Sequence, residues 1–315
     1  IIENHIIYVD INHEKIFSIP SVLNIINVIL KKLPCKVITC MVDDVMLAAY
    51  LVKCFYPDMI KIISVIHGST PSIYDDYISF RECSDFYVGV SQDIKNDMIG
   101  LGIESNSIES MTCPFYCEKS LNRTYTVNKK MPICIGYAGR MDGMENSQKR
   151  MDLLLKLMKL FEQKKVDFKA EFAGDGSARN KMECYVSLNN LNERICFLGK
   201  LEHSEIPDFW KRQDICINLA DYEGRSISVI EAMGSGTIPV VTATSGVRED
   251  IIDNVNGYIV PLGDYQLMAE RIEYLSQHRE RLEEMGKAAH NSIYPKSLME
   301  PHLRLWKKIL FEFMN

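Results

Sequence analysis

The stretch DICINLADYEGRSISVIEAMGSGTIPVVTA, residues 214–243, contains the elements of one complete β-α-β unit. "DICINLA" and "TIPVVTA" are short apolar runs typical of strands buried on both faces, and "VIEAMGS" between them reads as a helix. The same rhythm continues outward in "ICIGYAGR", "DFKAEFAGDG", "RICFLGK" and "NGYIVP", and in the first half in "HIIYVDI", "CKVITCMV", "IKIISVIHG" and "DFYVGVS". Strands that alternate with helices predict an α/β protein with doubly wound parallel sheets.

A polar segment, CEKSLNRTYTVNKKM at residues 117–131, separates the two blocks of alternating elements. We place a domain boundary near residue 125, so that residues 1–125 and 126–291 each form a Rossmann-like domain. Residues 292–315 carry apolar side chains at helical spacing and are predicted to form a C-terminal helix. The chain begins Ile1-Ile2-Glu3 rather than with Met, which suggests a fragment.

Composition excludes several classes of protein. The 315 residues are 47% apolar and 25% charged, with a net charge of −6, and residues 1–125 hold fifteen acidic against ten basic side chains, so nucleic acid is not an expected partner. Ten cysteines without a Cys-x-x-Cys pair indicate a reduced, cytoplasmic protein. The longest apolar run, IPSVLNIINVILKKL, is too short to span a membrane. The chain has no Asp-x-Asp pair, and we expect no essential metal ion.

Charged residues follow several predicted strands, at the edge of the sheet where ligands bind in doubly wound folds. Arg140 follows "ICIGYA", Lys149 comes shortly after it, and Glu223 and Glu231 follow "CINLA". Cations and the N–H groups at a helix start suit a diphosphate, while carboxylates suit sugar hydroxyls. The sequence therefore predicts a site for a nucleotide diphosphate sugar.

Some of these residues have alternative interpretations. Ser228-x-x-Glu231 also fits a capping box, which would stabilise the helix without a ligand. Either Lys149 or Arg150 could reach the phosphate, and Arg225 could contact a phosphate, contact an acidic sugar, or remain solvated. "AGDGSAR" lacks the third glycine of a dinucleotide loop and is more typical of a tight strand-to-helix turn.

In combination, these segments resemble the glycosyltransferase group 1 family, whose members are retaining enzymes with the GT-B fold. Glu223-Gly224 through Glu231-Ala232-Met233, followed by "GSGTIPVV", resembles the family's Glu-x7-Glu motif. "IGYAGRMD", "KRMDLLLKLMKLF", "EFAGDGSAR", "ICFLGKL" and "SGVREDIIDNVNGYIVP" are similar to other family segments in the same order. The resemblance implies two Rossmann-like domains facing a cleft. Compared with the family, the first domain lacks its N-terminal strand and glycine-rich loop.

The resemblance also implies roles for individual residues. Glu223 and His67 would be the catalytic residues that contact the transferred sugar, and Glu231 would hold the ribose hydroxyls. The residues implied to bind the donor diphosphate are Arg140, Lys149, Gly224, Arg225, Ser226, Ile227 and Ser228. The C-terminal helix would cross back to the first domain, which would bind the acceptor.

The function implied is metal-independent transfer of a hexose, with retention, from a UDP or GDP sugar to a glycan or lipid-linked acceptor. No cofactor is expected, and peripheral membrane association is compatible with a lipid-linked acceptor. Two alternatives stay open: a nucleotide-sugar epimerase on the same fold, and a non-catalytic module that binds nucleotide or glycan.

Overall fold

The computed structural model describes residues 18–112 and 114–313, which form two compact units divided at Met111–Thr112 and at Leu303–Arg304. The predicted strand "HIIYVDI" lies outside the described residues. The nine described cysteines are free thiols.

The described part of the first unit is built on a parallel sheet in the order β1-β2-β3-β4. Its strands are β1 (Cys35–Thr39), β2 (Ile60–Ile66), β3 (Phe86–Gly89) and β4 (Ile108–Ser110), and its helices are α1 (Ile19–Leu30), α2 (Asp44–Phe55), α3 (Pro71–Ser79) and α4 (Gln92–Gly100), with a 3-10 turn η2 (Arg81–Cys83). Three helices begin at side-chain caps, namely Asp43, Thr70 and Ser91, which accept hydrogen bonds from first-turn amides. The runs "CKVITCMV", "IKIISVIHG" and "DFYVGVS" are confirmed as strands.

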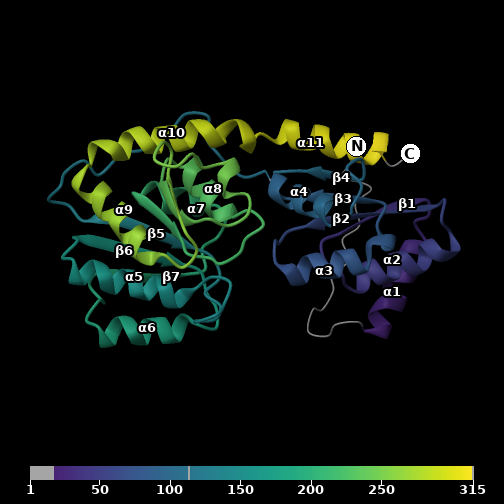
Figure 1. Ribbon diagram of the computed structural model, residues 1–315, viewed down its shortest axis with the longest axis horizontal. Coiled ribbons are helices and arrows are strands. Elements are labelled where there is room, and N and C mark those ends of the chain that lie inside the picture. The colour runs from purple at the N-terminus through teal and green to yellow at the C-terminus, as the bar shows by residue number, and fades with distance from the viewer. Residues whose placement is uncertain (1–17, 113, 314–315) are drawn as a thin grey trace. The chain divides into compact units, whose positions relative to one another are not determined.

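The second unit has a six-stranded parallel sheet in the order β10-β9-β8-β5-β6-β7. Helices α5, α6 and α9 cover one face of this sheet, and α7, α8 and α10 cover the other, each over its own apolar core (Figure 1). The elements are β5 (Ile133–Ala138), α5 (Met151–Gln163), β6 (Phe168–Ala173), α6 (Arg179–Leu188), β7 (Ile195–Gly199), α7 (Ile206–Lys211), β8 (Ile215–Asn218), α8 (Ile227–Gly234), β9 (Ile238–Thr242), η3 (Val247–Glu249), β10 (Tyr258–Val260), α9 (Tyr265–Gln277) and α10 (Glu280–Ser297).

The strand order of the second unit reverses between β5 and β8. From β5 the chain winds outward through β6 to β7, then returns to pair β8 with the other side of β5 and winds outward to β10. At such a reversal the loops after the two central strands separate and leave a crevice at the carboxyl edge. Here the loops after the two central strands are residues 139–150 and 219–226.

A tight turn after β6 supports one side of this edge. Gly174 has a φ of +127°, and a Cβ at this position would lie 1.9 Å from the carbonyl oxygen of Gly139. The "AGDGSAR" segment is therefore a strand-to-helix turn whose glycine allows two backbones to touch.

We expect Gly174→Ala to destabilise the protein by about 3 kcal/mol, since it combines an unfavourable φ with a clash against backbone. Thermal unfolding measures the effect. Gly100→Ala is the matched control, because no atom lies within 4 Å of a Cβ there, and its unfolding temperature should stay near that of the wild type. An equal unfolding temperature for Gly174→Ala would contradict the backbone contact.

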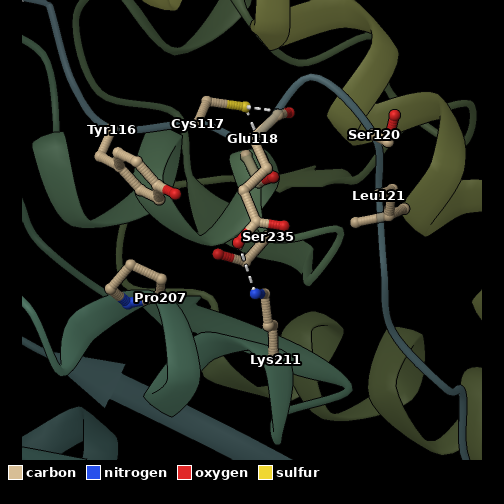
Figure 2. Close-up of a pocket in the computed structure, with 9 residues that line it drawn as sticks. Tyr116, Cys117, Glu118, Ser120, Leu121, Pro207, Lys211 and Ser235 are labelled. Atoms are coloured by element: carbon tan, nitrogen blue, oxygen red, sulfur yellow. Dashed lines mark hydrogen bonds and ion pairs between the residues drawn. The ribbon is translucent and has the colours of Figure 1, made fainter.

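The segment that enters the second unit packs against the ends of α7 and α8 around a small cavity (Figure 2). Lys211 pairs with Glu118 at 2.8 Å, and the Cys117 thiol lies 3.5 Å from the carbonyl oxygen of Gly234. Burial raises the pKa of Cys117 to about 11, so this thiol stays protonated near neutral pH. The contacts around this cavity hold the last turn of α8 in place.

The C-terminal segment continues from α10 into α11 (Met299–Lys308) and a π-helical turn, η4 (Ile309–Phe313). Residues from Arg304 onward belong to the first unit. There the ammonium group of Lys36 donates to the carbonyl oxygen of Leu310 and lies 5.6 Å from the ring centroid of Phe311.

Candidate active site

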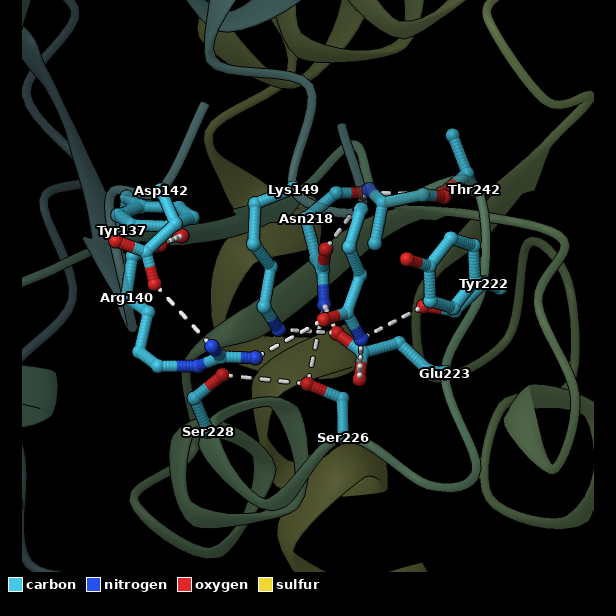
Figure 3. Close-up of polar contacts among 12 residues, drawn as sticks. Tyr137, Arg140, Asp142, Lys149, Asn218, Tyr222, Glu223, Ser226, Ser228 and Thr242 are labelled. Carbon is cyan, nitrogen blue, oxygen red and sulfur yellow. Dashed lines mark hydrogen bonds and ion pairs between the residues drawn. The ribbon is translucent and has the colours of Figure 1, made fainter. Parts of the chain in front are cut away.

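An ion pair joins the two loops that follow β5 and β8 of the second unit. Lys149, just before α5, pairs with Glu223, which follows β8, and their side chains are 14% and 10% exposed (Figure 3). Glu223 also accepts longer hydrogen bonds from the amides of Gln148, at 3.5 Å, and Asn218, at 3.4 Å. A carboxylate held by a cation and two amides has a fixed position at the carboxyl edge of the sheet.

Gln148 connects this carboxylate to Arg140. Its Oε1 accepts from the Arg140 guanidinium at 3.0 Å, and its Nε2 donates to the carbonyl oxygen of Tyr222 at 3.1 Å as well as to Glu223. The Arg140 side chain is 69% exposed and pairs with Asp142 at 3.2 Å, so its guanidinium is open to a ligand. We call Arg140, Gln148, Lys149, Asn218 and Glu223 the strand-end cluster. Gln148 and Asn218 were missed in the sequence because neutral amide side chains carry no charge signal.

Helix α8 begins beside the strand-end cluster without a side-chain cap. Ser226 occupies the N-cap position, but its hydroxyl contacts Asn218 at 3.0 Å and Ser228 at 3.3 Å instead of a backbone amide (Figure 3). The Ser226 side chain therefore does not accept a hydrogen bond from the first-turn amides of α8. Uncapped amides at a helix start are suited to an anion.

Glu231 lies in the second turn of α8. Since the helix begins at Ile227, Ser228 is not the N-cap, and the capping box with Glu231 does not form. Burial raises the pKa of the Glu231 carboxyl, an effect that His203 opposes, and no described side chain or backbone group hydrogen bonds to this carboxylate. A partly buried carboxylate with unused acceptor capacity is suited to ligand hydroxyls.

Arg150 and Arg225 bind partners outside the strand-end cluster. Arg150 pairs with Asp152 at 3.0 Å and Asp221 at 3.1 Å, and its φ of +49° is one that glycine adopts readily. Arg225 is buried, and its Nε donates to Asp250 at 2.9 Å.

His67 belongs to the first unit, where it directly follows β2 and is exposed. Partial desolvation lowers the pKa of its imidazole below the usual value, so the ring is neutral at pH 7. A neutral imidazole can both donate and accept a hydrogen bond.

No group of three or more His, Cys, Asp or Glu side chains in residues 18–112 and 114–313 could hold a metal ion. No helix in the same residues has the length and apolar character needed to cross a membrane.

Residues 121–292, more than half of the chain, match the model of a family described as glycosyl transferases group 1. The chain belongs to this family. The resemblance inferred from the Glu-x7-Glu segment is thus confirmed. The matched region of this group 1 glycosyltransferase includes the strand-end cluster, α8 and Glu231.

Curated relatives of this glycosyltransferase include an N-acetyl-alpha-D-glucosaminyl L-malate synthase of Bacillus anthracis, 24% identical over 85% of this chain and 72% of the relative. A poly(ribitol-phosphate) alpha-N-acetylglucosaminyltransferase of Staphylococcus aureus is 30% identical over 50% of this chain and 32% of the relative. The chain spans about a third of that second relative's length.

Solved structures confirm the GT-B fold predicted from the sequence. Staphylococcus aureus TarM, crystallised as a mutant with UDP and alpha-GlcNAc-glycerol, gives a TM-score of 0.77 at 19% identity, covering 94% of this chain and 59% of TarM. Anabaena HepE with UDP-glucose also gives 0.77, at 14% identity, covering 92% of this chain and 82% of HepE.

Proposed function

We propose that this group 1 glycosyltransferase moves a hexose, with retention and without a metal ion, from a UDP sugar to a glycan or lipid-linked acceptor in the cytoplasm. The observation that carries the proposal is the Lys149–Glu223 ion pair beside Arg140 and the uncapped start of α8. It brings positive groups and a fixed carboxylate to one edge of the sheet. UDP is our choice among nucleotides because TarM and HepE were crystallised with it.

In this proposal the donor diphosphate takes the place of protein acceptors around the cluster. Arg140 and Lys149 contact the phosphate oxygens, and the backbone of residues 224–228 donates N–H groups to them. Lys149 is favoured over Arg150, because the Arg150 guanidinium is already bound by Asp152 and Asp221, whereas Lys149 faces Glu223. Glu223 then contacts the transferred sugar and Glu231 the ribose.

The proposed reaction breaks the bond between the anomeric carbon and the diphosphate oxygen and forms a bond from that carbon to the acceptor oxygen. The acceptor proton passes to the departing diphosphate, so no side chain needs to act as a general base. Cations aimed at the leaving group stabilise the charge that develops on it. His67 of the first unit is proposed to contact the sugar from the acceptor side.

Nucleotide release tests the proposal. The chain is incubated with UDP and GDP sugars, with and without sugar acceptors, and free nucleotide and sugar products are measured. A glycosyltransferase consumes donor and acceptor together. Free nucleotide with a rearranged sugar would indicate an epimerase, and binding without turnover would indicate a recognition module.

We expect Glu231→Ala to weaken UDP binding by about tenfold to a hundredfold, the effect of losing hydrogen bonds to a charged acceptor. Isothermal titration calorimetry measures this change. The control ligand is 2′,3′-dideoxy-UDP, which should bind the wild type and the variant with equal affinity. If the substitution weakens both ligands equally, Glu231 does not contact the ribose.

The same contact predicts a pH dependence. The ribose hydroxyls bind the ionised carboxylate of Glu231, and burial raises the pKa of this group. As the pH is lowered, affinity for UDP should therefore begin to fall at a higher pH than it would with a glutamate of ordinary pKa. Glu231→Gln, which cannot titrate, should lose this component while retaining the part that is due to the phosphates.

A further inference from the structure

The Arg225 side chain forms a buried ion pair behind the loop that carries Glu223. Its Nε donates to Oδ2 of Asp250 at 2.9 Å and its Nη2 to Oδ1, which is a two-pronged arrangement, and both side chains are only 4% exposed. A planar guanidinium that meets a carboxylate in this way is held in direction as well as in position.

Asp250 is itself anchored to the rest of the second unit. The Lys296 ammonium, from α10, lies 2.8 Å from Oδ1 of Asp250, and the Asn256 amide donates to the Asp250 carbonyl oxygen at 2.9 Å. Arg225 also donates to the hydroxyl of Thr112. Asp250 is therefore held through its carboxylate by α10 and through its carbonyl oxygen by Asn256.

We propose that Arg225 is a positioning residue, which fixes the loop of residues 223–228 through Asp250 so that Glu223 and the first amides of α8 keep their places. Arg225 is two residues from Glu223 and one from the N-cap Ser226, so an anchor on its side chain limits the movement of both. This replaces the sequence-based prediction that Arg225 contacts the donor diphosphate. Turning the guanidinium toward a ligand would leave Asp250 paired with Lys296 alone, at the cost of a buried ion pair.

The inference rests on the proposed function in its choice of UDP as the probe. The variants are Arg225→Met and Asp250→Asn, and UDP affinity and amide hydrogen exchange in residues 223–228 are measured well below each unfolding temperature. Arg279→Met is the matched control. It removes another buried arginine that faces an aspartate, Asp214, at the opposite end of β8.

We expect both Arg225→Met and Asp250→Asn to weaken UDP binding by about tenfold or more and to speed amide exchange in residues 223–228. The control should lose stability while leaving affinity and exchange in this loop unchanged. Arg225→Lys, which keeps a charge for Asp250, should recover part of the affinity. If the Arg225–Asp250 pair only stabilised the fold, Arg225→Met and Asp250→Asn would change UDP affinity and exchange in residues 223–228 no more than Arg279→Met does.

Two results would overturn the proposal. If Arg225→Met loses UDP binding while Asp250→Asn binds as the wild type does, Arg225 contacts the phosphate directly. If both variants keep wild-type affinity and exchange, the pair only stabilises the fold. Should the wild type bind neither UDP nor GDP, the proposed function fails, and exchange in residues 223–228 alone decides whether Arg225 positions the loop.

Discussion

Glu223→Gln should lower turnover by about a hundredfold to a thousandfold, the size of effect seen when one fixed charged or polar contact to a transition state is removed. The neutral amide keeps the shape of the side chain, but it cannot balance the Lys149 ammonium or a positive charge that develops on the sugar ring. Steady-state kinetics with the preferred UDP sugar measures the loss. It should fall on kcat more than on KM, because the contact is proposed to strengthen in the transition state.

The control for this prediction is Asp221→Asn. Asp221 lies in the same loop, but its carboxylate faces Arg150 instead of Lys149 and is 33% exposed. Its substitution should change turnover less than about fivefold, which is the effect of a partly exposed ion pair of under 1 kcal/mol. Wild-type turnover in Glu223→Gln, with the control also unchanged, would remove Glu223 from the catalytic residues.

Asp214→Ala should destabilise the second unit by about 3–5 kcal/mol, because it leaves buried charge without a partner. Asp214 accepts from the Cys134 amide at 2.9 Å and lies 3.7 Å from the Arg279 guanidinium. Burial raises the pKa of Asp214, although the Cys134 amide, Arg123 and Arg279 oppose the shift. Desolvation also lowers the pKa of both arginines, so their charge is costly to keep without the carboxylate.

Thermal unfolding checks this prediction, with an expected decrease of about 10 °C for a unit of this size. Asp167→Ala is the matched control, since Asp167 pairs with Arg194 at 3.2 Å on the surface. An exposed pair of this kind contributes under about 1 kcal/mol. Equal unfolding temperatures for the two variants would show that the buried pair contributes no more than the exposed one.

The sequence predicted the class of fold because buried parallel strands are short, apolar and regularly spaced. It also predicted that the loops after "ICIGYA" and "CINLA" lie at the same edge of the sheet, and in the structure Lys149 from the first loop pairs with Glu223 from the second. β4 was not among the predicted strands because Ile108 is the only apolar residue in Ile108–Ser110, so this segment forms no apolar run.

The sequence did not predict which side chains contact one another across the fold. Gln148, in the loop before α5, and Asn218, the last residue of β8, both hold Glu223, and nothing in their neighbours marks them. Arg225 lies 25 residues from Asp250, so the choice between a phosphate and a buried carboxylate depends on how η3 packs behind α8. The capping box predicted as an alternative for Glu231 fails because α8 starts at Ile227, two residues before the Val229 start that an N-cap at Ser228 requires.

Buried ion pairs lie on both sides of strand β8. Asp214, directly before it, faces Arg279, and Arg225, in the loop that follows it, pairs with Asp250. The outer strands of the same sheet, β7 and β10, share no backbone pairing with β5 or β8. We therefore expect insertions beside β7 or β10 to disturb the spacing of the central loops less than insertions within residues 214–228. For protein engineering, the outer edges of the sheet are the places to try first.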